Sequence, residues 1–174
     1  MKRFLLLALV LVAALAVTGC GLVATGETAG EKAGEIAQFT LPAGFTPEFG
    51  MDVADTLMVG YNHTDGRSHI FLMQVPASSG LTQAQLEQSF SDAMARAQGD
   101  QAVETVETEE TQVTIGGETV TASIGTGTSS SDNTAYRVLT VPFTGIGGPA
   151  VLVYQRPEAD WNQAEVDEFL ASFE

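Results

Sequence analysis

DTLMVGYNHTDGRSHIFLMQV, residues 55–75, is the stretch that decides the fold expected for this chain. Its Asp65-Gly66 pair is a strong signal for a β-hairpin turn, because both residue types accept the backbone angles that such turns require. With this pair at the turn centre, residues 55–61 and 68–75 pair as two strands. One face then carries Leu57, Val59, Tyr61, Ile70 and Leu72, and the other carries Met58, Phe71, Met73 and Val75. Since both faces are apolar, we expect the hairpin to be covered on both sides.

An amphipathic helix is predicted after the hairpin. Thr82 and Gln85 have the spacing of a capping box, which begins a helix. Apolar residues then recur at helical intervals as far as Gly99, a residue type that commonly follows a helix C-terminus. These apolar residues are Leu86, Phe90, Ala93, Met94 and Ala97. The pattern predicts a helix that lies on the sheet.

Strand patterns occupy much of the remaining chain. A short strand is expected where Phe39 and Leu41 alternate before Pro42. Residues 125–133, GTGTSSSDN, have the composition of a loop. An acidic edge strand or loop is expected at 103–108, and further strands at 111–115, 118–124, 136–143 and 150–155.

The chain is predicted to end in a second helix. Asp160 and Gln163 can cap it, and its inward face carries Val166, Phe169, Leu170 and Phe173. The expected fold class is therefore α+β, a mainly antiparallel sheet of about six strands sandwiched with two main helices. A single domain, residues 36–174, holds these elements.

The order of these elements resembles a known fold. FTLPAGF at 39–45, LTQAQLEQSF at 81–90 and DEFLASF at 167–173, separated by a hairpin and a β-meander, resemble the PsbP-like fold. The extrinsic photosystem II protein, a yeast Ran-binding import factor and many small bacterial lipoproteins share that fold. The resemblance implies a non-catalytic binding or assembly module, and it carries no functional residue over to this chain.

The first residues predict an export signal, MKRFLLLALVLVAALAVTGC at 1–20. Lys2 and Arg3 precede an apolar run from Phe4 to Val17, the layout of a secretory signal peptide. The run is shorter than the ~20 residues that span a bilayer. Val17-Thr18-Gly19-Cys20 resembles the lipobox of bacterial lipoproteins. The resemblance implies removal of residues 1–19 by cleavage between Gly19 and Cys20, and acylation of Cys20 with diacylglycerol and a fatty acid such as palmitate.

Several acyl chains on Cys20 would anchor the protein stably in a membrane. Gly21 lies where an Asp typically marks retention at the inner membrane, so the outer membrane is favoured in a bacterium with two membranes. Two alternatives remain, a soluble secreted protein with an incidental cysteine and a plain amino-terminal anchor helix. Residues 20–35 lack sustained apolar periodicity and are expected to form a flexible tether, roughly 20 Å in reach.

The charge of the chain limits its partners. The net charge is −15, and removal of Lys2 and Arg3 with the signal peptide makes it −17. This acidity argues against nucleic acid and against electrostatic docking on anionic lipid, since both need basic patches. It is compatible with solubility, with a saline habitat, or with a cation site.

Candidate metal ligands fall in two places. His63, Asp65 and His69 lie together in the sequence, but the hairpin register directs His63 and His69 to opposite faces, so they are not expected to chelate together. Calcium is a weaker option at the acidic run Glu104, Glu107, Glu109 and Glu110, which also reads as a solvated edge that discourages strand pairing.

Catalytic motifs are incomplete. Ser131-Asp132-Asn133 matches one motif of serine β-lactamases, but the S-x-x-K and K-T-G motifs are missing from the sequence. Gly145 to Pro149 lies between two strands and lacks the helix that a phosphate loop requires. The chain is therefore not expected to be an enzyme. A hydrolase that uses His63, Asp65 or His69 is the remaining catalytic alternative.

Aromatic residues offer a possible ligand groove. Tyr61, Tyr154 and Trp161 carry polar tips that favour a wet edge, and the alternative, which is favoured, is that they cap the rim of the core. The leading expectation is an exported, lipid-anchored lipoprotein that binds or helps assemble an unknown envelope protein. The alternative is a lipoprotein that binds a small ligand or calcium.

Overall fold

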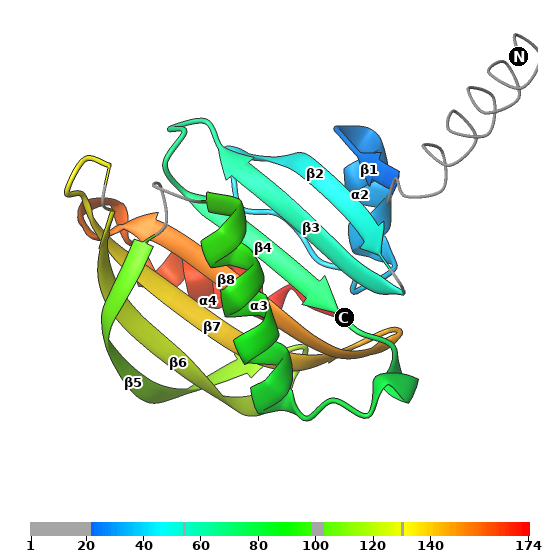
Figure 1. The fold of residues 1–174 in the computed structure, drawn as a ribbon. Helices are drawn as coiled ribbons and strands as arrows, with labels where there is room; N and C mark the ends of the chain where they lie inside the picture. The colour runs from blue at the N-terminus through cyan, green and yellow to red at the C-terminus, as the bar shows by residue number, and fades with distance from the viewer. Residues whose placement is uncertain (1–21, 54, 99–102, 130) are drawn as a thin grey trace, which may run out of the picture.

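The structure is a computed structural model that describes residues 22–53, 55–98, 103–129 and 131–174. These residues form one antiparallel sheet with strand order β1-β2-β3-β4-β8-β7-β6-β5, together with three α-helices (Figure 1). The strands are β1 (Leu22–Ala24), β2 (Phe45–Val53), β3 (Thr56–His63), β4 (His69–Gln74), β5 (Val103–Ile115), β6 (Glu118–Ser129), β7 (Ala135–Gly145) and β8 (Gly148–Pro157). The helices are α2 (Glu27–Gly34), α3 (Gln83–Gln98) and α4 (Gln163–Ala171), with short 3-10 turns at Ala77–Ser79 and Glu158–Asp160.

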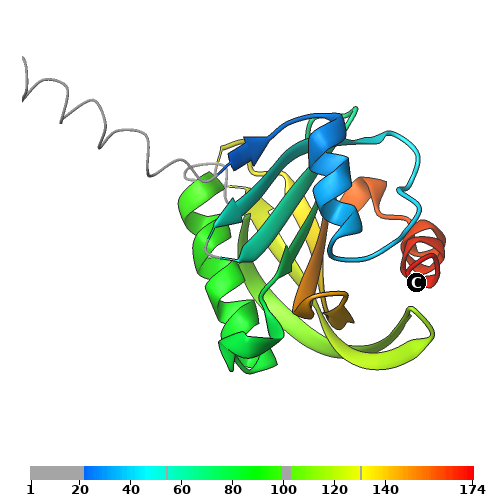
Figure 2. The same ribbon diagram turned by 90° about the vertical axis from the view of Figure 1, so that its right-hand side faces the viewer.

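The helices cover both faces of the sheet. Figure 2 shows α3 on one side and α2 and α4 on the other. The predicted α+β sandwich is confirmed, but the expected six strands become seven strands of six or more residues plus the three-residue β1. No helix within the described ranges is long and apolar enough to cross a bilayer.

The predicted hairpin is confirmed in its register. Tyr61 pairs with Ile70, and Asn62 with His69, which centres the turn on Asp65-Gly66. The two faces also separate as expected. Leu57, Val59, Tyr61, Ile70 and Leu72 join the core beneath α2 and α4, and Phe71, Met73 and Val75 join the core beneath α3.

The Asp65 carboxylate holds the hairpin turn together. Its oxygens accept hydrogen bonds from the Arg67 amide at 2.7 Å, the Ser68 amide at 2.8 Å and the Ser68 hydroxyl at 2.7 Å. Burial alone would raise the pKa of Asp65. The hydrogen bonds from Ser68 and Arg67, together with the nearby His63, hold that pKa well below its usual value.

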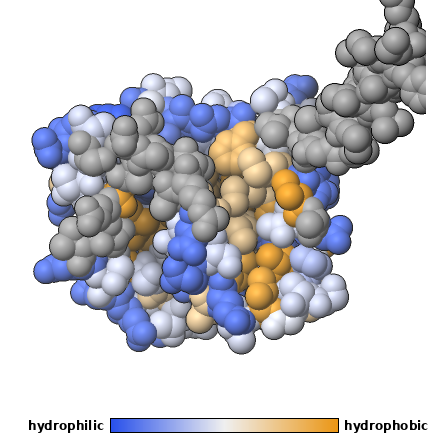
Figure 3. Space-filling model, in the orientation of Figure 1, coloured by the Kyte–Doolittle hydropathy of each residue, from blue (hydrophilic) through white to orange (hydrophobic). Residues whose placement is uncertain are grey.

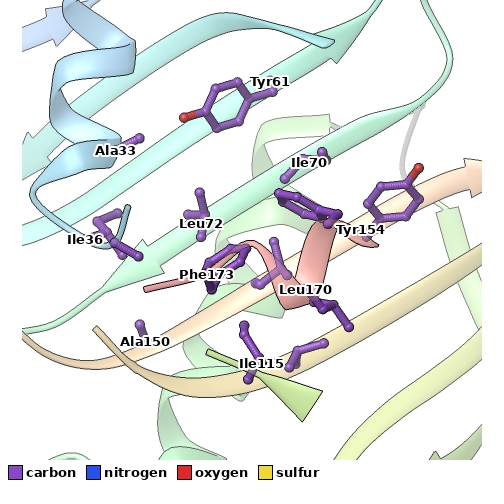
Figure 4. Close-up of a cluster of buried hydrophobic side chains, with 14 of the residues drawn as sticks. Ala33, Ile36, Tyr61, Ile70, Leu72, Ile115, Ala150, Tyr154, Leu170 and Phe173 are labelled. Atoms are coloured by element: carbon purple, nitrogen blue, oxygen red, sulfur yellow. The ribbon is translucent and has the colours of Figure 1, made fainter. Parts of the chain in front are cut away.

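The larger core fills the space between the sheet and α4 (Figure 4). Its side chains come from seven strands, β2 to β8, and from both ends of the domain. Several of them are fully buried: Ile36, Ile70, Leu72, Leu139, Leu152, Tyr154 and Leu170. Phe39 stacks on Phe173, with ring centroids 4.8 Å apart. The segment between α2 and β2 is therefore tied to the C-terminal residues by direct packing.

The two predicted helices form where expected, with one change. The α3 capping box is confirmed, since the Thr82 amide donates to Gln85 Oε1 at 2.9 Å and the Gln85 amide donates to Thr82 Oγ1 at 3.3 Å. For α4 the N-cap is Asn162 rather than Asp160 or Gln163. Its side chain accepts from the Ala164 and Glu165 amides. The predicted inward residues of α4 are buried.

The predicted flexible tether is wrong for residues 22–34. Leu22–Ala24 pairs with Gly50–Asp52 as β1, and the following α2 packs on the sheet. Ala29 and Ala33 are buried, and a Cβ atom at Gly50 would lie 3.1 Å from the Ala29 Cα atom. The stripe that holds α2 down consists of alanines, which give little apolar periodicity, so the sequence pattern missed it.

Four further features differ from prediction. Residues 37–42 form no strand, because Phe39 and Leu41 pack into the core from an irregular segment. β2 was not expected. β5 is a single strand with a register shift between Thr105 and Glu107, and β6 continues through residues 125–129, which were expected to be a loop. The expected edge position of the acidic segment is confirmed.

Candidate ligand site

A hollow opens on the α3 face of the sheet, between β2 and β3 on one side and the β6–β7 connection on the other. Its volume is about 390 Å³. It combines apolar and polar linings. The apolar side chains are Phe49, Met51, Met58 and Phe71, and the polar ones are Glu48, Arg67, His69, Ser129, Ser131, Asp132, Tyr136 and Gln155. Figure 3 views this face and shows apolar surface among hydrophilic residues.

The apolar lining residues Phe49, Met51, Met58 and Phe71 form one wall of the hollow. This apolar wall exists because α3 covers only part of the sheet face on which it lies. Leu86 and Phe90 of α3 pack with Phe71 and with residues of β8. Phe49 and Met58 contact the same cluster but remain partly exposed. The uncovered part of β2 and β3 thus leaves an apolar surface at the edge of a packed core.

An irregularity in β2 directs two consecutive side chains toward the hollow. The pairing of β2 with β3 shifts between Pro47 and Phe49, and both Glu48 and Phe49 line the hollow. Such bulges re-aim side chains that would otherwise alternate. The Phe49 ring lies over Gly60, where a Cβ atom would fall 2.3 Å from the ring. Glycine at position 60 is thus needed for the ring to lie there.

A polar row crosses the sheet at the other side of the hollow. His69 pairs with Asn62 on β3 and with Gln155 on β8, so the three side chains share one face. Among the described residues, the buried atoms His69 Nδ1 and Asn62 Oδ1 have no hydrogen-bond partner. Leaving such a group unpaired costs about 1–3 kcal/mol. Of these three residues, His69 and Gln155 line the hollow, so a molecule there can bond to these two side chains.

The protonation state of His69 follows from its surroundings. Its ring stacks on Phe71, with centroids 5.7 Å apart and an interplanar angle of 15°. Burial lowers the pKa of His69, and the carboxylates of Glu48 and Asp65 partly oppose that effect. At neutral pH the imidazole is therefore uncharged and offers one donor and one acceptor.

The opposite rim comes from the β6–β7 connection together with residues of β6, β7 and β8. Ser129 and Gln155 are buried polar residues, and the Ser129 and Ser131 hydroxyl oxygens lie 2.8 Å apart. Tyr136 is also buried, which raises the pKa of its hydroxyl. Charges of both signs complete the rim, with Glu48 and Asp132 against Arg67, whose guanidinium also lies 3.3 Å from Asp160.

The structure separates the two histidines, as the hairpin register predicts. His69 lies on the α3 face, whereas His63 packs against Phe45 on the opposite face and places Nδ1 2.9 Å from Asp65 Oδ2. Within the part of the chain that the structure describes, no group of three His, Cys, Asp or Glu residues is arranged to hold a metal ion. His63, Asp65 and His69 therefore do not form one site.

The acidic run lies along the exposed edge strand. Glu107, Glu109 and Glu110 are exposed on β5, and Glu109 and Glu110 point to opposite faces because strand side chains alternate. Glu107 and Glu109 line a shallow hollow together with Arg137, whose positive charge disfavours a divalent cation there. The side chain of Glu104 lies outside the described residues. Gly19 and Cys20 lie outside them too.

The predicted aromatic groove is not formed. Tyr61 and Tyr154 are 1% and 0% exposed and belong to the core. The Tyr154 hydroxyl donates to Glu165 Oε1 at 2.7 Å and accepts from Arg156, which also bonds that carboxylate. Trp161 packs edge-on against Tyr154 at 5.6 Å, with the Arg137 guanidinium 5.5 Å from its ring. These rings stabilise the core rim, the alternative that the sequence left open.

The two remaining motifs form turns. Ser131-Asp132-Asn133 forms the β6–β7 connection, where Asp132 Oδ1 accepts from the Thr134 amide at 2.9 Å and Asn133 has a φ of 57°. Residues 145–148 form the tight β7–β8 turn. The buried side chain of Gln74 accepts from the Gly147 amide at 2.9 Å and fixes that turn.

Sequence reasoning missed the apolar wall because it missed β2. Pro47 argues against a strand, although Phe45, Phe49, Met51 and Val53 recur at near-alternate positions around it. The available signal was this alternation. The hollow itself brings together residues from β2, β3, β4, β6, β7 and β8 and from the β3–β4 and β6–β7 connections, which only the folded sheet makes neighbours.

Comparison with known proteins gives no relative. No model of a protein family matches the chain, and no curated protein shows significant similarity to it.

Proposed function

We propose that this chain is an exported lipoprotein of the cell envelope, anchored by acyl groups on Cys20, whose PsbP-like domain binds another envelope component without catalysis. One observation carries the proposal: the lipobox-like sequence Val17-Thr18-Gly19-Cys20 runs almost directly into the sheet. Only Gly21 separates Cys20 from Leu22, the first residue of β1. A lipid on Cys20 would therefore act on a folded domain and not on a free tail.

The arrangement of elements supports the PsbP-like part of the proposal. A strand hairpin, a helix on one face, a β-meander and a terminal helix on the other face follow one another from β3 to α4. The binding character is supported by a surface that combines an open hollow with an acidic edge. In a bacterium with two membranes, Gly21 favours the outer membrane.

A second candidate function is the binding of a small ligand, and the hollow favours it. Ligand sites are commonly concave and apolar with a few convergent polar groups, and their volumes start at roughly 300 Å³. The hollow on the α3 face has this composition. The candidate ligand site is therefore the surface around His69 and not the rings of Tyr61, Tyr154 and Trp161.

The proposal is tested by crosslinking in cells followed by purification of the tagged full chain. Wild type is expected to recover a dominant envelope partner from the membrane fraction. Cys20→Ala, which removes the acylated thiol, is expected to stay unprocessed and to lose that partner. Recovery of the same partner at the same yield by Cys20→Ala would contradict a role for the lipid anchor, and recovery of no partner by wild type would contradict the assembly function.

A further inference from the structure

The hollow on the α3 face lies beside the strand that the proposed anchor would hold at the membrane. Consecutive Cα atoms are about 3.8 Å apart, so Cys20 lies within roughly 7.6 Å of Leu22. β1 pairs with β2, with Val23 opposite Met51, and Met51 lines the hollow. Neighbouring strands are about 4.8 Å apart. Since Cys20 is three residues from Val23, the Met51 Cα atom lies within roughly 16 Å of the Cys20 Cα atom.

From this position and its lining we propose that the hollow binds a single-chain zwitterionic phospholipid at the membrane surface. This inference rests on the proposed lipid anchor for the location of the site, whereas the chemistry of the site stands on the lining residues alone. The acyl chain contacts Phe49, Met51 and Met58. The headgroup lies toward His69, Tyr136 and Arg67.

The two halves of the lining match the two halves of such a lipid. The partly exposed apolar wall of β2 and β3 takes hydrocarbon, which is favourable in proportion to the apolar area removed from water. The rim carries Glu48 and Asp132, which suit an ammonium group, and Arg67, which suits a phosphate. A rim of one sign would instead have favoured a singly charged ligand.

His69 on β4 and Gln155 on β8 line the hollow and offer hydrogen bonds that a bare hydrocarbon chain cannot use. His69 lines the hollow, its Nδ1 atom has no partner among the described residues, and its uncharged imidazole can donate or accept. A headgroup with an ammonium and oxygen atoms can pair with an imidazole nitrogen in either role. The acyl chains on Cys20 have no headgroup at this row, so a separate lipid fits the hollow better than the anchor itself.

The volume limits the size of the ligand. About 390 Å³ is near the lower end of the range for small-molecule sites. It suits a headgroup with part of one chain and excludes most of a two-chain lipid. We therefore choose a lysophosphatidylethanolamine as the probe.

The experiment uses the mature lipidated protein in bilayer nanodiscs and a lysophosphatidylethanolamine whose chain carries a photoactivatable diazirine. After irradiation, peptide mass spectrometry locates the crosslink. We expect labelling on β2 and β3, at Phe49, Met51 or Met58. Unlabelled lysophosphatidylethanolamine should compete roughly tenfold better than lysophosphatidylglycerol of equal chain length or dodecyl maltoside. Crosslinks spread over the whole surface, or equal competition by all three amphiphiles, would overturn the proposal.

Variants separate binding from folding. His69→Leu removes a buried nitrogen that lacks a partner, so the melting temperature should not fall, whereas crosslinking should fall roughly tenfold because the headgroup loses a hydrogen bond. Tyr136→Phe, which removes only a hydroxyl, should weaken labelling as well. His63→Leu on the opposite face is the matched control and should label like wild type. Normal labelling of both His69→Leu and Tyr136→Phe would refute headgroup recognition.

The same sample distinguishes this inference from the anchor proposal. The intact mass reports whether Cys20 is acylated, independently of any crosslink. An acylated protein that the probe does not label, because its own chains fill the hollow or for any other reason, overturns the lipid site and leaves the anchor standing. An unmodified Cys20 with specific labelling of β2 and β3 would overturn the anchor and leave the site.

Discussion

At the scale of single residues, the molecule depends on a few side chains that fix turns and on two glycines that admit close neighbours. Asp65 holds the β3–β4 turn with three hydrogen bonds, and Gln74 fixes the β7–β8 turn. Gly60 admits the Phe49 ring, and Gly50 admits α2. Substitutions that remove these contacts should change the stability of the protein measurably.

The charge on Asp65 should stabilise the fold. Its pKa is lower in the folded protein than the 3.8 of the unfolded chain. Asp65 therefore adds its full contribution to the free energy of unfolding above pH 3.8, and this contribution is lost as the pH falls through the folded-state pKa. We expect Asp65→Asn to lower the free energy of unfolding at pH 7 by about 2 kcal/mol. Urea titrations from pH 7 to pH 2 would measure it. If the difference in free energy of unfolding between wild type and variant stays constant down to pH 2, the charge on Asp65 is not the source of the stabilisation.

The contact between Gly60 and Phe49 should be sensitive to a single methyl group. Gly60→Ala places a Cβ atom where the Phe49 ring lies and should destabilise the protein by about 1–3 kcal/mol. Phe49→Ala in the same background removes the clash. Phe49→Ala should therefore lower the free energy of unfolding less in the Gly60→Ala variant than in wild type. Additive effects in this double-mutant cycle would rule out the contact.

At the scale of elements, the sequence predicts those that carry a strong local signal. The β3–β4 register followed from one Asp-Gly pair, and α3 followed from its capping box and apolar stripe. The sequence did not predict α2 or β2, because α2 packs through alanines and glycine and β2 contains Pro47. The apolar wall depends on β2, and the polar row depends on pairing between strands distant in sequence. For these reasons the hollow was not predictable from local patterns.

The packing of α2 can be tested with two substitutions in opposite directions. Gly30 has an ordinary helical position with space for a Cβ atom, so Gly30→Ala should raise the free energy of unfolding by about 0.5–1 kcal/mol. Ala33 is buried, and Ala33→Asp should lower the free energy of unfolding by about 3 kcal/mol because a charge enters the core. Chemical denaturation measures both. If residues 27–34 were a flexible tether, neither variant would change stability.

The acidic side chains on β5 should protect an open sheet edge. β5 is the last strand in the sheet order, and Glu107 and Glu109 are exposed on it. Charged side chains discourage pairing between edge strands of different molecules. We expect the double variant Glu107→Val, Glu109→Val to form oligomers at concentrations where wild type is monodisperse, as measured by light scattering. A monodisperse variant would show that the charges have no such role.

At the scale of the whole molecule, the short connection between Cys20 and β1 determines how the domain would lie on a membrane. β1 and β5 are the two ends of the sheet order (Figure 1). Under the proposed anchor, the β1 edge and the nearby end of β2 would be held at the bilayer and the β5 edge would extend away from it. A flexible tether would instead let every face of the domain approach the lipid equally.

The orientation is measured by placing one nitroxide label at Val53→Cys and, separately, at Gln112→Cys. Both positions are exposed, the first near β1 and the second on β5. With the lipidated protein in vesicles that carry nickel-chelating headgroups, relaxation of the label at residue 53 should be strongly enhanced and that at residue 112 only weakly. Equal enhancement at both positions would contradict an anchored β1 edge.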